Sequence, residues 1–429
     1  MDHASKAAAF ALDIQRVVLP NGLVLLASEN HAAPSVSINA IVLAGSRLEA
    51  DDKAGLASIV GEMIDEGTAT RSSQQIAESI EAVGGRFATF GDYESSGLAV
   101  LMLAQDLPLG LDLTADMLIN STLPEEKVHQ QIERRAAQIR SRLDVPRTQA
   151  SDVFNELIYA GTPQHRPPIG YEESVTKLSR SDVESFYKRH YTPANTIVSV
   201  VGDIDKQQLV DRVTTLFGSW AAGNPGSGDI QVAKPVLQDK PVSRFVDAPK
   251  EQVNVFIGHL GVERRNPDYY ALLVMDTILG SSPGFTSRIP RVLRDEQGLA
   301  YSTYANITSS AGIDPGRFVA YIGTSPENLD RALTGLRGEI SRIVEEPVSQ
   351  RELDTAKAYL TGSFVFKFQR NSQVAEFLVD AEVYGLGFDY LQRYPEIIRN
   401  ITVDDVTRVT KKYLHPDRLT TVVVGPIRD

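Results

Sequence analysis

The alternation of apolar and polar residues predicts a mixture of strands and helices at the start of the chain. Asn21-Gly22 lies between two Val-rich runs, and because Asn-Gly accepts positive φ, it predicts a hairpin turn. Apolar and polar residues alternate over Val36–Val42, which predicts a strand. Apolar residues then recur at helical spacing at Leu56, Ile59, Val60, Met63 and Ile64. Gly67 is predicted to end this helix.

The mixture continues over the next forty or so positions. Ser72 is a predicted helix cap, and Gly84-Gly85 is predicted to stop that helix after Val83. Residues 87–103 predict one or two strands around a turn at Gly91-Asp92. Strands and helices mixed within one unit are typical of α+β or α/β layering.

An internal repeat relates the two parts of the chain. Residues 178–204 read LSRSDVESFYKRHYTPANTIVSVVGDI, and residues 401–427 read ITVDDVTRVTKKYLHPDRLTTVVVGPI, without gaps at an offset of 223. Each copy predicts a capped helix, a proline turn, a β-branched strand and a glycine stop. Chance similarity between short amphipathic helices is the alternative explanation. The repeat favours two related halves of just over 200 residues.

We therefore predict an N-terminal half at residues 1–218, a linker at 219–240 and a C-terminal half at 241–429. The linker prediction rests on helix-breaking residues between Phe217 and Lys240. These residues are Gly218, Gly223, Pro225, Gly226 and Gly228.

Composition excludes several kinds of chemistry. The 429 residues include no cysteine, so disulfides, thiolate metal sites and a cysteine nucleophile are excluded. The net charge of −12 argues against a nucleic-acid surface, which needs clustered Lys and Arg. No apolar run approaches the roughly 20 residues of a membrane-spanning helix. Residues 1–12 lack the pattern of a signal peptide, although Ala4–Ala11 is compatible with the remainder of one, so exported and cytoplasmic origins both stay open.

The histidines do not by themselves predict a metal site. Seven histidines occur, and no two have the i, i+3 or i+4 spacing that places both on one helix face. The common nucleotide, calcium and serine-hydrolase motifs are also missing from the sequence.

Residues 55–68 carry a resemblance to a known family. They read GLASIVGEMIDEGT, which resembles the zinc helix of the pitrilysin/insulinase peptidases, typically GLAHxxEHMxxxGT. In the H-x-x-E-H motif two histidines bind zinc and the glutamate activates water. The corresponding positions here are Ser58, Gly61 and Glu62, and the family spacing places the third ligand at Gln138. The resemblance therefore implies a degenerate zinc motif, and we expect this chain to bind no metal.

The remaining acidic residues of this segment have an ordinary explanation. Glu62 is interpreted as a solvated or hydrogen-bonded helix residue. Asp65 and Glu66 are interpreted as helix-end charges.

Two later segments extend the resemblance over the whole chain. Residues 353–364 are similar to the late helix of the family, and residues 279–304 are similar to LGxGxxSRLxxxxRexxGLAYS in its C-terminal half. In the family an arginine and a tyrosine seven residues later bind substrate and stabilise the tetrahedral intermediate. The matching residues are Arg294 and Tyr301. The alternative is that Arg294 pairs with Asp295 or a neighbour and that Tyr301 packs in the core.

The resemblance implies both a fold and a function. The implied fold is α+β, with two homologous halves that are each a mainly antiparallel sheet packed with helices, as in one half of a clam-like processing peptidase. The implied function is that of a non-catalytic subunit of a heterodimeric zinc metallopeptidase, inactive alone. A homologous partner with an intact H-x-x-E-H motif would hold the zinc, and Arg294 and Tyr301 would act in trans on its peptide substrate.

Other expectations stay open beside this one. The chain is alternatively a structural subunit like the core proteins of respiratory bc1 complexes, or a peptide-binding module without hydrolysis. Residues 280–286 lie in the region that corresponds to a glycine-containing loop of the processing peptidase's non-catalytic subunit. They hold only Gly280 and Gly284, so a plain turn before a helix is the preferred interpretation. Because paired bacterial members are often exported, we expect a periplasmic rather than a cytoplasmic location.

Overall fold

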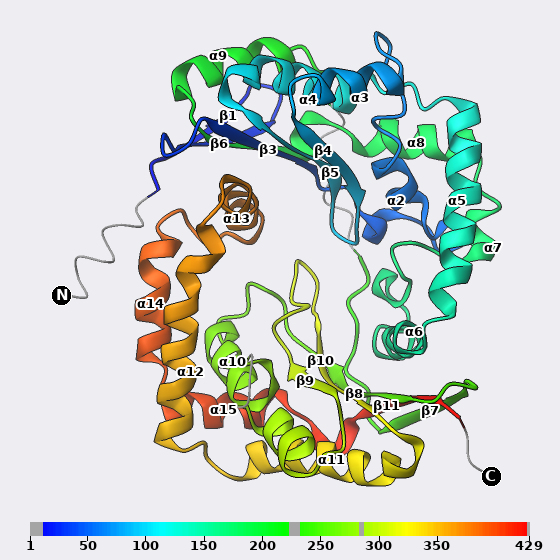
Figure 1. Cartoon of the computed structure of the whole chain (residues 1–429), viewed down its shortest axis with the longest axis vertical. Coiled ribbons are helices and arrows are strands. Elements are labelled where there is room, and N and C mark those ends of the chain that lie inside the picture. Colours follow the sequence, from blue (N-terminus) through cyan, green and yellow to red (C-terminus); the bar gives the residue numbers. More distant parts are fainter. Residues whose placement is uncertain (1–11, 223–231, 283–286, 427–429) are drawn as a thin grey trace. The chain divides into compact units, whose positions relative to one another are not determined.

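The computed structural model describes residues 12–222, 232–282 and 287–426 (Figure 1). The chain divides into two compact units, each built from three separate segments. Unit 1 comprises Met1–Arg140, Arg166–Val232 and Phe366–Tyr390. Unit 2 comprises Ser141–His165, Ala233–Val365 and Leu391–Asp429.

A six-stranded sheet organises unit 1. Its strands are β1 (Ile14–Val18), β2 (Val24–Glu29), β3 (Ser35–Val42), β4 (Arg86–Gly91), β5 (Ser96–Leu103) and β6 (Thr196–Gly202). Their order across the sheet is β1-β2-β6-β3-β5-β4. Only the β2–β6 pair is parallel among the pairs of this sheet, so the sheet is mainly antiparallel.

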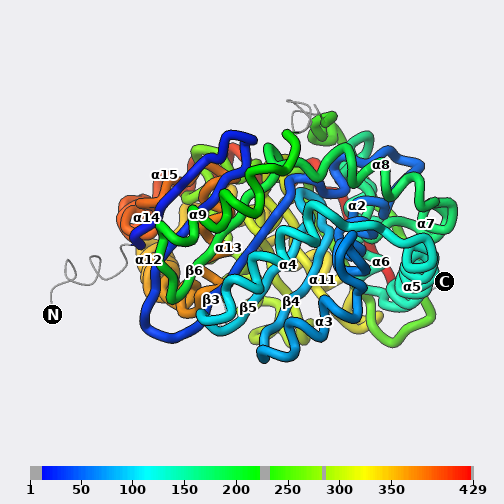
Figure 2. The backbone as a smooth tube through the Cα atoms, turned by 90° about the horizontal axis from the view of Figure 1, so that it is seen from above, coloured from blue at the N-terminus to red at the C-terminus, as the bar shows by residue number. Residues whose placement is uncertain are grey.

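Helices cover both faces of this sheet. In Figure 1, α4 (Leu107–Asn120) and α9 (Lys206–Phe217) lie on one face and α13 (Asn371–Tyr384) lies on the other. Figure 2 shows α9 and α4 from above, and the two helices pack against each other, α9 on β2 and α4 on β3 and β5. Because both faces are covered, every residue of β6 is buried, and its sequence is a nearly continuous β-branched run.

A five-stranded sheet organises unit 2 in the same way. Its strands are β7 (Val242–Asp247), β8 (Val253–Leu260), β9 (Ser302–Asn306), β10 (Arg317–Thr324) and β11 (Thr420–Gly425), in the order β7-β11-β8-β10-β9. The β7–β11 pair is parallel and the other pairs are antiparallel. Helix α6 (Pro146–Ile158) covers one face and α11 (Leu329–Glu345) the other (Figure 1). The predicted α+β fold, with two mainly antiparallel sheets packed with helices, is confirmed.

The remaining helices complete the two units. Unit 1 contains α2 (Leu56–Gly61), α3 (Ser73–Glu81), α5 (Glu125–Leu143, as far as Arg140), α7 (Glu172–Val175) and α8 (Arg180–His190). Unit 2 contains α10 (Tyr269–Asp276), α12 (Gln350–Ser363), α14 (Tyr390–Asn400, from Leu391) and α15 (Val403–Tyr413). Two π-helices, η7 (Thr277–Ser281) and η8 (Pro290–Glu296), also lie in unit 2.

The repeat occupies equivalent places in the two sheets. Helices α8 and α15 have bounds that differ by 223 residues, and each begins with a capping box, at Ser179 and Thr402 respectively. A proline turn then leads into β6 or β11, and each of these strands pairs parallel on one side and antiparallel on the other. Two β-strand layers of related topology therefore arise from the two copies.

The predicted local elements of unit 1 form, with one correction. The hairpin turn forms between β1 and β2, with Gly22 at a φ of 94°. The first helix, α2, ends at Gly61 rather than at Gly67. Beyond Gly61 the amide of Met63 donates to Val60 and that of Glu66 to Met63, which is the tighter i−3 pattern. Glycine is a poor helix former, so the regular helix stops there although the apolar spacing continues.

Each sheet is covered by a helix from a distant part of the sequence. Helix α6 precedes residue 219 but packs on β8 and β11, where the Phe154 and Phe256 rings lie 5.9 Å apart. Helix α13 follows residue 240 but packs on β3 and β6, with Leu378 fully buried. The compact units therefore draw on segments from both sides of the predicted linker. Of that linker, residues 223–231 lie outside the described residues.

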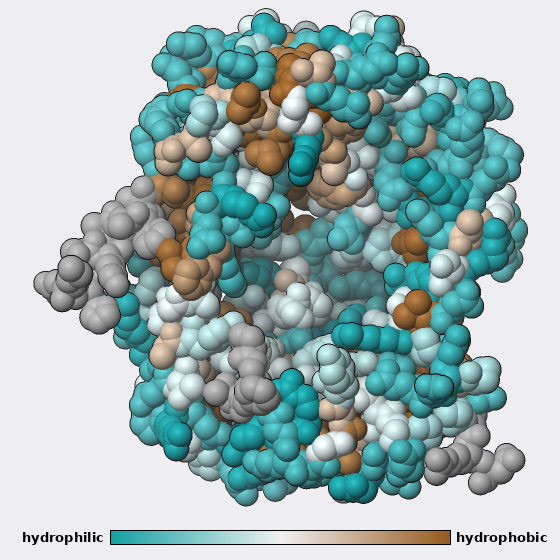
Figure 3. All heavy atoms as spheres, viewed as in Figure 1, coloured by the Kyte–Doolittle hydropathy of each residue, from teal (hydrophilic) through white to brown (hydrophobic). Residues whose placement is uncertain are grey.

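Hydrophilic residues cover most of the surface seen in Figure 3. Among the described residues, no helix combines the length and the apolar character that spanning a membrane requires. Residues Ala4–Ala11, on which the expectation about a removed leader rests, lie outside the described residues.

Candidate functional site

Two of the predicted motif positions, Ser58 and Gly61, lie on α2, which packs against strand β4, and Glu62 is the C-terminal cap of this helix. Ser58 is buried, and its hydroxyl donates to the carbonyl of Gly55 at 3.2 Å. A Cβ added to Gly61 would lie 2.3 Å from the carbonyl oxygen of Phe90, and one added to Gly91 would lie 2.5 Å from Cα of Ser58. The helix and the strand therefore touch through two glycines. A glutamate at position 61 would require the strand to move away.

Glu62 is bound from α5. Gln131 donates to its carboxylate at 2.6 Å, and the guanidinium of Arg135 lies 2.6 Å from the same oxygen. The Arg135 side chain is 4% exposed, so its charge depends on this carboxylate for compensation. Gln138, the position that the family spacing indicates, is exposed one turn further along α5. Sequence reasoning missed Gln131 and Arg135, although residues 131, 135 and 138 follow the i, i+4, i+7 spacing of one helix face.

These side chains do not fit a zinc ion. A catalytic zinc needs about three protein ligands and a water. Position 58 offers a hydroxyl committed to its own helix, position 61 offers no side chain, and Glu62 is neutralised by an arginine. The described part of the chain contains no group of three or more His, Cys, Asp or Glu residues that could hold a metal.

The other acidic residues of this segment have distinct environments. Glu66 pairs with Lys127 at 2.9 Å. Burial raises the pKa of Asp65 to about 6, and the hydroxyl of Thr89 lies 3.4 Å from its carboxylate. Both lie a few residues beyond the end of α2 at Gly61.

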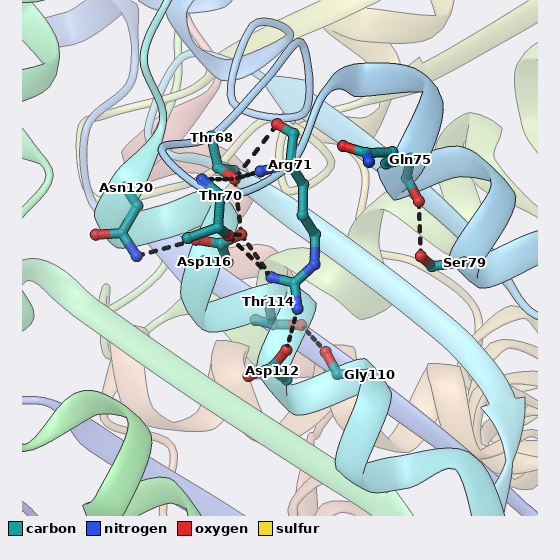
Figure 4. Close-up of polar contacts among 10 residues, drawn as sticks. All are labelled: Thr68, Thr70, Arg71, Gln75, Ser79, Gly110, Asp112, Thr114, Asp116 and Asn120. Atoms are coloured by element: carbon teal, nitrogen blue, oxygen red, sulfur yellow. Dashed lines mark hydrogen bonds and ion pairs between the residues drawn. The ribbon is translucent and has the colours of Figure 1, made fainter.

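Thr68, near the end of the motif-like segment, takes part in a hydrogen-bond network in this chain. Thr68 donates to Asp116 of α4 at 2.7 Å and accepts from the amide of Arg71 (Figure 4). Arg71 reaches two carboxylates of the same helix, Asp112 at 2.6 Å and Asp116 at 2.7 Å. This network fixes the loop after α2 to α4.

The structure brings Arg294 and Tyr301 to one place on unit 2. Arg294 lies near the end of η8, and Tyr301 directly precedes β9. Both line an open hollow of about 490 Å³, together with Ala300, Ser302 and Thr303. A second hollow of about 510 Å³ includes Arg294 and lies against η7 and β9. The two residues are therefore neighbours on a surface that is open to a ligand.

The two side chains differ in how they are held. Tyr301 is 91% exposed, so the alternative that it packs in the core is wrong. The Nε of Arg294 donates to Asp295 at 2.9 Å, which is the ion pair that the alternative for Arg294 predicted. Arg294 nevertheless lines both hollows. A guanidinium and a phenol at one surface can both donate hydrogen bonds to a carbonyl oxygen that gains negative charge.

The start of the glycine-containing segment packs tightly. Gly280 belongs to η7, and a Cβ there would lie 2.3 Å from the amide nitrogen of Ala305 in β9. Ser281 donates to the carbonyl of Ala305 at 2.8 Å. Residues 283–286, which carry the rest of this prediction, lie outside the described residues.

Two family models match the sequence. Residues 24–167 match the family described as insulinase (peptidase family M16). Residues 177–360 match the family described as peptidase M16 inactive domain. The first match contains the degenerate motif, and the second contains Arg294 and Tyr301.

Individual relatives match over nearly the whole chain. An uncharacterised zinc protease of Mycobacterium bovis is 29% identical over 97% of this chain and 94% of its own length. A protein of the same description from Streptomyces coelicolor is 28% identical over 97% and 90%. A peptidase M16 inactive domain from Pseudomonas fluorescens has a TM-score of 0.88 at 22% identity, covering 97% of this chain and 99% of that one. A protease from Helicobacter pylori has a TM-score of 0.89 at 22% identity, covering 97% and 100%.

Proposed function

Because this chain belongs to peptidase family M16, the insulinase family, we propose that it is the non-catalytic subunit of a heterodimeric zinc metallopeptidase. The predicted resemblance of the chain to that family is confirmed. The proposal assigns zinc to a homologous partner with an intact H-x-x-E-H helix. It assigns to this chain Arg294 and Tyr301, which act on the partner's peptide substrate.

One contrast carries the proposal. At the motif, a glycine contact and the Glu62–Arg135 ion pair occupy the space that metal chemistry would need. In the open hollow of unit 2, Tyr301 is almost fully exposed and lies beside Arg294. At 91% exposure, Tyr301 contributes little to the core, so its side chain is accessible to a ligand. A subunit that supplies donors to another chain's active site accounts for both observations.

The chemistry assigned to this chain is electrostatic. Neither side chain activates water at neutral pH, so hydrolysis depends on the partner. Donors placed where an oxyanion develops commonly contribute factors of about 10² to 10³ in rate. The proposal therefore requires no activity from this chain alone and a large dependence of the complex on the two donors.

The test compares the chain alone with the chain mixed with an M16 partner that carries the intact motif. Zinc content and cleavage of a fluorogenic peptide library are measured for each. We expect the lone chain to contain no stoichiometric zinc and to be inactive, and the mixture to be active. Arg294→Ala combined with Tyr301→Phe should lower kcat/KM of the mixture by roughly 10²-fold or more.

Arg331→Ala supplies the matched control, because Arg331 is an exposed arginine of α11 that lines neither hollow. It should leave kcat/KM unchanged. Stoichiometric zinc in the lone chain, or full activity of the complex with the double variant, would contradict the proposal. Gel filtration of each mixture separates a loss of chemistry from a loss of pairing.

A second candidate function is a structural subunit of a larger assembly. It is favoured by the similarity to a chain of complex III2 from Candida albicans, with a TM-score of 0.79 at 18% identity over 96% of this chain and 95% of that one. This candidate predicts that Arg294 and Tyr301 are dispensable in every mixture. The same double variant therefore distinguishes the two functions.

The proposal also includes a periplasmic location, which follows from the exported location of paired bacterial members. Fractionation of the source cells, with detection of this chain by antibody, tests it. Recovery in the cytoplasmic fraction would remove this part and leave the role of the two donors untouched.

A further inference from the structure

A further cavity of unit 2, separate from the two hollows at Arg294, is lined by arginines and has no part in the proposed function. Its volume is about 580 Å³, and it lies among η7, the start of η8, the end of α11 and the start of α12. Its charged lining residues are Arg288, Arg291, Arg342, Arg351, Glu346 and Glu352. Four cations against two carboxylates leave a local excess of two positive charges, in a chain whose net charge is −12.

Arg288 is the buried cation of this cavity. The residue is 5% exposed, and it donates through Nε and Nη2 to the carboxylate of Glu352, at 2.7 and 3.1 Å. Its Nη1 is buried and has no hydrogen-bond acceptor within the described ranges. Buried cationic N–H groups are normally satisfied, so this atom indicates a missing acceptor.

Glu352 cannot supply that acceptor. Burial acts to raise the pKa of this carboxyl group, but hydrogen bonds from Arg288 and Ser349 outweigh burial and lower the pKa to about 2. Its second oxygen also accepts from the amide and hydroxyl of Ser349, both at 2.8 Å. The carboxylate is therefore fully charged and already occupied.

The rim adds positive charge that is weakly compensated. Arg291 is exposed and its nearest carboxylate, on Glu296, lies 3.7 Å away. Arg351 is exposed in the first turn of α12, and no carboxylate pairs with its guanidinium in the described part of the chain. Arg342 is the better compensated one, with Glu346 at 3.0 Å. The N-terminal end of α12, a helix of 14 residues, also faces this region and favours negative charge.

We propose that this cavity is a binding site for a small oxyanion ligand, one that bears a phosphate or carboxylate group. Guanidinium groups match both anions through paired N–H donors. The volume lies within the range of small-molecule sites. No aromatic side chain lines the cavity among the described residues, so the site recognises the charged group itself rather than a stacked ring.

Isothermal titration calorimetry on the full-length lone chain tests the proposal, with tripolyphosphate and citrate titrated separately at constant ionic strength. We expect saturable binding at one site per chain. Arg291→Gln combined with Arg351→Gln should weaken it by at least about tenfold. Both residues are exposed, so the variant is expected to fold, and circular dichroism checks this. Arg212→Gln combined with Arg331→Gln removes two exposed charges elsewhere and should bind like the parent chain.

The two titrants identify the group that the site prefers. Saturation by tripolyphosphate alone assigns a phosphate ligand, saturation by citrate alone assigns a carboxylate ligand, and saturation by both assigns the oxyanion class; each supports the site. No saturable binding tighter than about 1 mM would overturn it. Equal affinity of the two double variants would also overturn it, because binding would then follow net charge. Neither result bears on Arg294 and Tyr301, which line other hollows.

Discussion

Gly61 and Gly91 allow a helix and a strand to approach more closely than any side chain permits. Gly61→Ala would place a methyl group 2.3 Å from the carbonyl of Phe90, so β4 or α2 must shift. We expect a loss of roughly 1–3 kcal/mol in the free energy of unfolding, as for other overpacked sites. Urea denaturation measures it.

Gly338→Ala in α11 is the matched control, because a Cβ there meets nothing within 4 Å. Alanine is the better helix former, so this variant should be neutral or more stable by up to about 1 kcal/mol. Equal effects of the two substitutions would show that backbone propensity, rather than the contact with Phe90, controls position 61.

His259 carries a dependence of stability on pH. Burial lowers its pKa to about 4, and its two ring nitrogens suit the neutral form. Nε2 accepts from the amide of His415 at 3.1 Å, and Nδ1 lies 2.7 Å from the carbonyl of Leu260. In the unfolded chain the pKa is about 6.5. The unfolded state therefore binds more protons between these values, and stability falls as pH falls from about 6.5 to 4.

We expect His259→Gln to remove this component. Between pH 7 and pH 5 the parent chain should lose about 2 kcal/mol more stability than the variant. Burial raises the pKa of Asp276 to about 7, which acts in the opposite direction, so only the difference between the two chains isolates His259. Chemical denaturation at several pH values measures it. His129→Gln, at an exposed histidine, should keep the parent profile.

For the candidate site, the sequence predicted which residue types occupy the family's positions, but not which side chains contact one another. The loss of the histidine pair at positions 58 and 62 is visible directly, and so is the Arg294–Tyr301 spacing. The partner of Glu62 was not predictable in this way. The family spacing pointed to Gln138, whereas the carboxylate selects a cation, and Arg135 is the arginine that α5 places within reach. Which turn of a helix faces a given group depends on how the helix packs, and spacing alone does not determine that.

At the scale of elements, capping boxes and periodicity predicted most of what forms. Ser72 caps α3 with Gln75, and the paired caps at Ser179 and Thr402 start the two copies of the repeat. The two π-helices were not predicted, because a π-turn differs from an α-turn by one residue in its hydrogen bonding and leaves little trace in an apolar pattern. They carry Gly280 and Arg294, the second of which belongs to the proposed site.

The sequence also did not predict on which sheet α6 and α13 pack. An amphipathic pattern shows that a helix buries one face, but it does not show which sheet receives that face. Ala150, Phe154 and Ile158 of α6 are all buried, and they join the core that contains Phe256 and Val422. The predicted division at residue 219 places α6 in the N-terminal half, whereas its residues pack in unit 2.

At the scale of the whole molecule, each unit needs a helix encoded on the far side of residues 219–240. Residues 1–218 expressed alone would lack α13, and residues 241–429 would lack α6. We expect each fragment alone to be poorly folded, because a buried sheet face loses its cover. Co-expressed fragments should assemble and copurify. Circular dichroism and gel filtration of the separate and the combined fragments measure this.

A fragment that folds alone with the full stability of the intact chain would contradict this expectation. The control is the intact folded chain cleaved between residues 219 and 240, because α13 and α6 are then already packed on their sheets. The two pieces should remain associated in gel filtration.

The late position of α13 in the sequence also determines when unit 1 can complete its folding during synthesis. When the ribosome has completed β6 at Gly202, the six strands of unit 1 all exist, but α13 ends about 180 residues later at Tyr384. At 5–20 residues per second that interval is about 10–40 s, during which one face of an apolar sheet has no cover. We therefore expect the nascent chain to bind chaperones until α13 has been synthesised. Termination before residue 371 should yield an aggregation-prone product rather than a smaller functional protein.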